Sequence, residues 1–159
     1  MDKLPTKCFV IMPFSKTEDK RTEEYWTTHF DKFLKPTIKK SNDIVVTRSK
    51  PVRGDIIKDI ISDLISADIV VADLTDANPN VYWELGVRQS FKHGTVTIAE
   101  FGTKLPFDIN NKGTLFYYPN DYIKNAEFQT NLTDAITDCI NNPNRPDSKV
   151  LETTTGTGS

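Results

Sequence analysis

The chain has few of the residues that metal centres and disulfide frameworks require. Among its 159 residues there are two cysteines, Cys8 and Cys139, and two histidines, His29 and His93. Their spacing does not form a zinc-ligand set, so we expect no metal site. Cys8 lies in an apolar run and is interpreted as a small core residue in a reducing compartment. No apolar run approaches membrane-spanning length and no signal peptide is visible, so we expect a cytoplasmic protein that does not enter a membrane.

The charge and glycine patterns that polymeric and dinucleotide ligands need are also missing. The formal net charge is -2, which provides no basic field for a nucleic-acid backbone. The loop after the first apolar run contains neither a G-x-G-x-x-G turn nor a P-loop. No Ser-His-Asp or Cys-His arrangement is convincing. We therefore expect no bound cofactor and no nucleic-acid polymer, and a small molecule or a protein as the partner.

What the chain does contain is typical of one folded domain. It is 37% hydrophobic and 26% charged, which argues against disorder. Short apolar runs alternate with helical patterns, which predicts a doubly wound, Rossmann- or flavodoxin-like α/β fold. Its parallel sheet has about five strands, with helices on both faces. The predicted strands are Cys8–Met12, Asp43–Thr47, Asp68–Leu74, Thr95–Phe101 and Thr114–Tyr118.

Four segments between and after these strands have helical periodicity. Pro36 is expected to kink or shorten the first, and isoleucines form one stripe on the second. The four segments are 23–40, from Gly54 onward, from Asn78 or Asn80 to about His93, and 121–140. Residues 1–140 are predicted to form the domain. Residues 141–159 have almost no apolar side chains and are predicted to be a linker or disordered tail, of the kind where a longer protein would continue.

One stretch, from Ala72 to Gly86, carries most of the candidate chemistry. A buried strand is predicted to end at Asp73, and Glu84 follows among aromatic and leucine side chains in the next helix. Ligands of parallel α/β sheets bind at the carboxyl ends of the strands. A carboxylate among apolar neighbours has a raised pKa and suits attack on the anomeric carbon of a ribosyl group, which passes through an oxocarbenium-like transition state.

Each candidate in this stretch also has a structural interpretation. Glu84 can form a helix-face ion pair with Arg88, four residues on. Asp73 can cap its loop, or it can bond a base or a sugar hydroxyl. Asn78 and Asn80 can cap the helix, or their amides can face a ligand over the helix start.

The loop after the first strand lies on the same predicted rim, and it contains Met12, Pro13, Phe14 and Ser15. Phe14 can stack on a base and Ser15 can bond a hydroxyl or a phosphate, or both can pack within the loop. Arg48 and Arg53 flank the exit of the second strand, where they either meet a phosphate or are solvated. His29, with Tyr25 and Trp26, is interpreted as part of the helix packing.

Two motifs resemble the nucleoside 2-deoxyribosyltransferase family. Asn78-Pro79-Asn80-Val81-Tyr82-Trp83-Glu84-Leu85-Gly86 is similar to that family's helix-start motif, often Asp-Pro-Gly-Thr-Ala-Phe-Glu-Ile-Gly. Phe9-Val10-Ile11-Met12-Pro13-Phe14 resembles its opening strand and Pro-Phe loop. Asp73 is placed like the family's strand-end aspartate. The implied similarity covers roughly residues 7–140.

The resemblance implies roles for individual residues. Glu84 would be the nucleophile that takes the deoxyribosyl group as the base departs, and Asp73 would help to hold the base. Asn78 stands where the family usually has an aspartate near the base. The family's relatives include nucleotide N-glycosidases and TIR-like domains, which cleave NAD or sense nucleotides. Members commonly complete the site with a neighbouring subunit, which implies a homo-oligomer.

Two functions follow as hypotheses. The first is an enzyme that cleaves the N-glycosidic bond of a nucleoside, nucleotide or NAD-like small molecule at Glu84, as a hydrolase or as a transferase. The second is a non-catalytic TIR-like module of a bacterial defence or signalling protein, which binds a nucleotide on the same rim. The departure at Asn78 favours the second.

Overall fold

A computed structural model describes residues 4–40, 43–49, 56–106 and 113–156. Its five strands form one parallel sheet in the order β2-β1-β3-β4-β5. The doubly wound fold predicted from the sequence is thereby confirmed. The strands are β1 (Thr6–Ile11), β2 (Ile44–Arg48), β3 (Ile69–Asp73), β4 (Thr95–Glu100) and β5 (Leu115–Tyr117).

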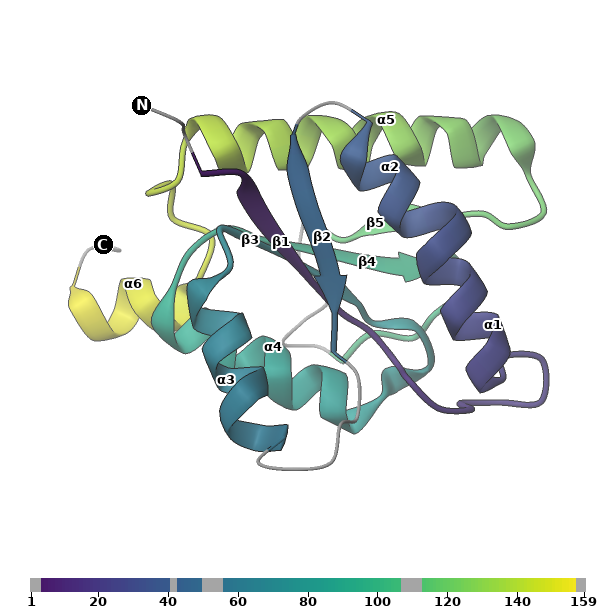
Figure 1. Cartoon of the computed structure of the whole chain (residues 1–159), viewed down its shortest axis with the longest axis horizontal. Helices are drawn as coiled ribbons and strands as arrows, with labels where there is room; N and C mark the ends of the chain where they lie inside the picture. The colour runs from purple at the N-terminus through teal and green to yellow at the C-terminus, as the bar shows by residue number, and fades with distance from the viewer. Residues whose placement is uncertain (1–3, 41–42, 50–55, 107–112, 157–159) are drawn as a thin grey trace.

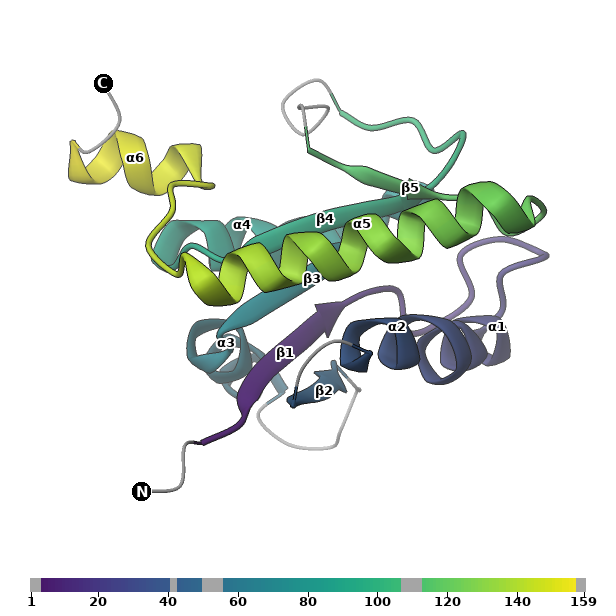
Figure 2. The same cartoon turned by 90° about the horizontal axis from the view of Figure 1, so that it is seen from above.

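Helices cover both faces of this sheet (Figures 1 and 2). One face packs against the first helical segment, which comprises α1 (Glu23–Thr28), η1 (His29–Leu34) and α2 (Lys35–Lys39), and against α5 (Tyr122–Asn141). The opposite face packs against α3 (Ile56–Ser66) and α4 (Pro79–Phe91). Residues of β3 alternate between the two cores and all are buried, as a strand at the centre of a two-sided parallel sheet requires.

The strand order reverses between β1 and β3, because β2 lies on one side of β1 and β3 on the other. The loop after β1 runs to α1 on one face, whereas the loop after β3 runs to α4 on the other. A doubly wound sheet opens its ligand crevice at such a switch point, outside the carboxyl ends of the strands. This edge is therefore where a functional site is expected.

The first helical segment continues past Pro36, although the sequence predicted a kink or an early end there. Its middle turn, η1, is a π-helix in which the Lys35 N–H donates to the Phe30 carbonyl, five residues back. The Thr37 hydroxyl donates to the Phe33 carbonyl at 2.7 Å. Pro36 has no N–H and its ring would clash in a regular turn, and the wider turn accommodates both effects.

The isoleucine stripe of α3 is less buried than its periodicity predicted. Leu64 is fully buried, but Ile57 is 62% exposed and Ile65 is 39% exposed. The reason is that α3 packs chiefly against α4, so only the side of α3 that faces α4 is buried. On α5, Phe128, Leu132 and Ile136 are buried as predicted, whereas Ile123 in its first turn is exposed. None of the described helices combines the length and the apolar composition that crossing a membrane requires.

The segment after α5 differs from the predicted linker or tail. It forms a short helix, α6 (Lys149–Thr155), which packs against α4. The Asp147 carboxylate accepts hydrogen bonds from the backbone N–H groups of Gly94 and Thr95, and the buried Ser148 hydroxyl donates to the Gln89 carbonyl. Polar side chains that satisfy buried backbone groups hold this segment, and an apolar pattern does not detect them.

Candidate functional site

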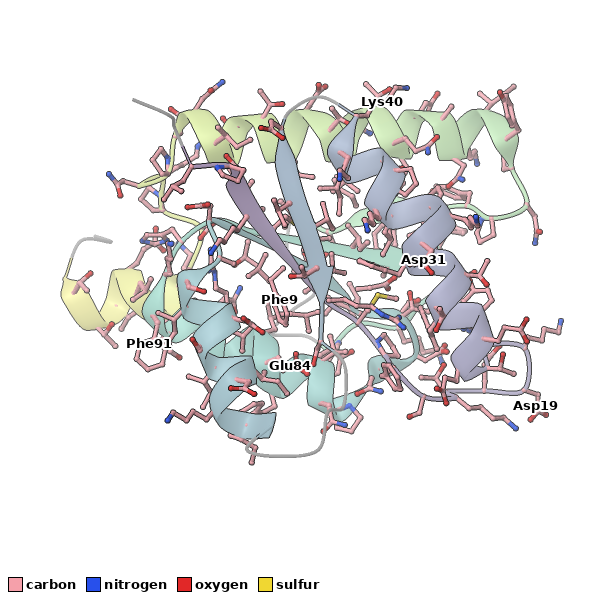
Figure 3. The ribbon with its side chains drawn as sticks, viewed as in Figure 1. Phe9, Asp19, Asp31, Lys40, Glu84 and Phe91 are labelled. Atoms are coloured by element: carbon pink, nitrogen blue, oxygen red, sulfur yellow. The ribbon has the colours of Figure 1, made fainter. Side chains whose placement is uncertain are left out.

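Glu84 occupies an inward-facing position of α4. The other buried side chains of this helix are Val81 and Arg88, three and four residues from Glu84, and Leu85, which follows it and lies four residues from Val81. These spacings place all four on one side of the helix. The Glu84 residue is only 7% exposed. Figure 3 shows it on α4, in the same part of the view as Phe9 of β1, against which this helix packs.

One oxygen of the Glu84 carboxylate, Oε2, is buried without a hydrogen-bond partner among the described residues. Burial raises the pKa of Glu84 from its ordinary 4.5 to about 7, with no charged neighbour contributing to the shift. A carboxylic acid with this pKa exchanges its proton near neutral pH, which is a property of groups that perform acid–base or nucleophilic work.

The alternative interpretation of Glu84, an ion pair with Arg88, is wrong. The buried Arg88 guanidinium instead donates to five backbone carbonyls, which belong to Leu64, Ala67, Asp68, His93 and Gly94. Arg88 thus joins the ends of α3 and α4 to the start of β4. All of its hydrogen bonds go to the backbone, so it offers no counter-ion to Glu84.

Asn78 is the N-cap of α4. Its side-chain oxygen accepts from the N–H groups of Asn80 at 2.9 Å and Val81 at 3.3 Å, and Pro79 begins the helix. The structure therefore supports the capping interpretation of Asn78 over direct contact with a ligand by this oxygen. The Asn80 side chain is exposed over the same helix start.

Asp73 is fully buried, and every one of its acceptor positions is used. Oδ1 accepts from the Thr75 N–H at 3.1 Å and the Thr75 hydroxyl at 2.7 Å. Oδ2 accepts from the Tyr117 hydroxyl at 2.9 Å and lies 3.1 Å from His29 Nε2. A ligand could bond Asp73 only by displacing one of these donors. The carboxylate instead orients the side chains of His29 and Tyr117.

Asp73 and Glu84 are thus not brought together, although both belong to the same predicted stretch. Asp73 has the orientation of Val71, two residues earlier, toward the face covered by α1 and α5. Glu84 belongs to α4, on the opposite face.

The loop after β1 is packed rather than open. Met12 and Pro13 are buried, Phe14 is half-buried, and Ser15 is exposed. The Arg48 guanidinium stacks over the Phe14 ring at 5.2 Å and donates to the Trp26 carbonyl at 3.2 Å. Phe14 therefore stacks on an arginine of its own chain. Arg53 lies outside the described residues.

The sequence did not identify Arg21, which ties down the loop between β3 and α4. Its guanidinium binds both carboxylate oxygens of Asp76 at 2.6 Å and Glu100 Oε2 at 2.8 Å. Asp76 and Ala77 have φ values of 65° and 53°, a left-handed conformation that is costly for residues other than glycine. Burial raises the pKa of Asp76, but hydrogen bonds from Arg21 and Thr17 outweigh it and hold the pKa below its ordinary value.

Two of the cavities among the described residues lie away from Glu84. One, of about 490 Å³, lies on the α1 and α5 face and is lined by His29 and Tyr117. The other, of about 740 Å³, lies near the amino ends of β4 and β5, where Gly94, Thr95 and Thr114 line it. It is therefore at the opposite end of the strands from the switch point. No cluster of three or more potential metal ligands occurs in the described ranges.

From the sequence, His29 is interpreted as part of the helix packing and Tyr117 only as a residue of the fifth strand, so neither is predicted as a site residue. A signal was present for His29, which is three residues from Trp26 and four from Phe33 and so lies on their inward stripe. A histidine on an apolar stripe needs a polar partner, and the strand-end Asp73 is that partner.

Comparison with protein-family models gives no match for this chain, and comparison with curated proteins gives no significant match either.

Proposed function

We propose that this protein cleaves the N-glycosidic bond of a nucleoside, nucleotide or NAD-like molecule, with Glu84 as the nucleophile. The observation that carries the proposal is the buried Glu84 carboxylate, whose Oε2 has no partner in the described part of the chain and whose pKa is about 7. The resemblance of the Asn78–Gly86 motif to nucleoside 2-deoxyribosyltransferases supplies the substrate class.

The chemistry requires an ionised, poorly solvated carboxylate. As the bond to the base breaks, positive charge develops on the sugar ring, and Glu84 traps the anomeric carbon as a glycosyl ester. Water or a second base then releases the sugar. The resemblance also implies that a neighbouring subunit completes the site, and this completion is part of the proposal.

The test is base release from a panel of ribo- and deoxyribonucleosides, nucleotides and NAD. We expect Glu84→Gln and Glu84→Ala to lower the rate on the order of 10³-fold or more. The matched control is Glu127→Gln, which alters an exposed glutamate on α5 and leaves the rate unchanged. Ionisation of Glu84 is required, so the wild-type rate rises through pH 7 and levels off above it. Equal rates in wild type and Glu84→Gln would reject the proposal.

A second candidate is a module that binds a nucleotide without cleaving it. It is favoured by the hydrogen bonding of two residues that the resemblance places near the base. The Asn78 oxygen caps α4, and Asp73 is filled by donors from its own chain. Calorimetry that shows a nucleotide bound, together with recovery of that nucleotide unchanged, distinguishes this function from the enzyme.

A further inference from the structure

A cavity with aromatic walls lies on the face of the sheet opposite Glu84. It opens between the first helical segment and the start of α5, with a volume of about 490 Å³. Its walls include four rings, from Tyr25, His29, Phe33 and Tyr117. This volume lies within the range of small-molecule pockets, which are mostly apolar with a few oriented polar groups. We refer to it as the aromatic cavity.

Asp73 determines which nitrogen of His29 is available in the aromatic cavity. An ionised carboxylate only accepts hydrogen bonds, so His29 Nε2, 3.1 Å from Asp73 Oδ2, must carry the proton. In the neutral imidazole, Nδ1 is then an acceptor with a free lone pair. Within the described residues Nδ1 forms no hydrogen bond, and the His29 side chain is 7% exposed.

The surrounding rings hold the His29 imidazole in one plane. Tyr25 stacks nearly parallel to it, at 9° and 5.8 Å between centroids, and Tyr117 contacts it at 5.0 Å. Phe33 contacts it at 5.4 Å. His29 and Phe33 both belong to η1, and π-helical turns are frequent at functional sites.

Packing alone does not require this arrangement. A buried polar pair can often be replaced by apolar residues of similar size with no loss of stability. Here Asp73 uses all of its acceptor positions, and the histidine that it orients lines an open volume. Such an arrangement orients an imidazole toward a ligand, as buried carboxylates do for functional histidines.

We propose that the aromatic cavity is a binding site for a planar heteroaromatic ring that donates an N–H hydrogen bond to His29 Nδ1. The ring contacts the aromatic walls, where offset or edge-to-face geometry is favourable. This site is independent of the proposed chemistry at Glu84, because the two lie on opposite faces of the sheet.

Nuclear magnetic resonance of the imidazoles tests this proposal directly, because the chain has only two histidines. The probes are benzimidazole, which has the N–H donor, and 1-methylbenzimidazole, which lacks it. We expect the free protein to show His29 protonated at Nε2, and benzimidazole to shift the His29 signals. His93 is the internal control and stays in place, since it lies at the amino end of β4 beside Asp147. The methylated probe should bind about tenfold more weakly, the effect of one lost hydrogen bond.

A second measurement uses tryptophan fluorescence. Trp26 contacts the His29 ring at 5.6 Å, and Trp83→Phe removes the only other tryptophan of the chain. Benzimidazole should change the Trp26 emission in Trp83→Phe, and His29→Phe should abolish that change while His93→Gln retains it. Glu84→Gln should bind the probe as wild type does, which separates this site from the proposed enzyme.

Three results would overturn the proposal. They are a His29 proton on Nδ1, equal binding of the two probes, and unshifted His29 signals at millimolar benzimidazole. If His29→Phe does not fold, the wild-type titrations decide, because they change no residue of the site.

Discussion

Two buried carboxylates, one on each face of the sheet, have opposite surroundings. Asp73, toward α1 and α5, accepts hydrogen bonds at all four of its positions. Glu84, on α4, has no hydrogen bond to Oε2 among the described residues, and its pKa is raised to about 7. Both residues are buried, since Asp73 is 0% exposed and Glu84 is 7% exposed.

The difference shows that partners, more than depth, decide what a buried carboxylate can do. A carboxylate surrounded by donors is stabilised as the anion and serves to orient those donors. A carboxylate without donors is destabilised as the anion and is available to react or to bind a cation-like centre. We therefore assign a positioning role to Asp73 and propose the chemical role for Glu84.

The largest predicted effect is that of Asp73→Ala. This change removes the acceptor of His29 Nε2, of the Thr75 N–H and of one hydroxyl of the Thr75–Tyr117 pair, whose oxygens lie 2.9 Å apart, so we expect a loss of about 3–5 kcal/mol in the free energy of unfolding. Urea denaturation measures it. Asp73→Asn keeps one acceptor oxygen and should lose less. A loss below about 1 kcal/mol for Asp73→Ala would show that the network is not formed.

Glu84→Gln should raise the free energy of unfolding, whereas Asp73→Ala lowers it, and the size of the gain should depend on pH. The pKa of Glu84 is higher in the folded chain than its ordinary 4.5, so the folded state binds more protons and stability falls as pH rises from 4.5 through 7. This decline amounts to about 3 kcal/mol between pH 4.5 and 8.5, and the amide abolishes it. Thermal and urea unfolding of both proteins at the two pH values measure it. A wild type with the same pH dependence as Glu84→Gln would contradict the raised pKa.

Arg21→Met probes the loop between β3 and α4, which connects Asp73 to the helix that contains Glu84. Asp76 would lose both guanidinium hydrogen bonds while its backbone stays at φ 65°. We expect a loss of about 2 kcal/mol, the typical worth of hydrogen bonds to a charged group, measured by urea denaturation. Lys16→Met is the matched control, because it removes only the exposed pair with Asp19 and should change stability little. Equal effects of the two changes would show that the Arg21–Asp76 ion pair does not stabilise this loop.

The smallest effect is expected at Asn78. Asn78→Ala removes the cap of α4 and should cost about 1 kcal/mol, measured by thermal unfolding. Asn78→Asp keeps the acceptor and places a negative charge at the helix start, so it should be neutral or slightly stabilising. Destabilisation by Asn78→Asp would show that the amide group of Asn78 has a further role.

Much of the fold could be predicted because its signals are local. Continuous apolar runs such as residues 69–72 are typical of a strand buried on both faces, and their alternation with helical periods predicts a doubly wound sheet. The failures have equally local causes. Periodicity could not show that Ile57 lacks a neighbour to cover it, or that Asp147 binds the backbone of Gly94.

For the candidate site, the sequence by itself identified Glu84 as a carboxylate among apolar neighbours, because its flanking residues predict burial. It also placed Asp73 at a strand end and Asn78 at a helix start, where backbone geometry alone sets their positions. Only the tertiary structure decided that Arg88 binds carbonyls of other elements instead of Glu84, and that His29 meets Asp73 across 44 residues of chain. Hydrogen bonds between distant elements depend on which face of the sheet each element packs, and one segment of sequence does not contain that information.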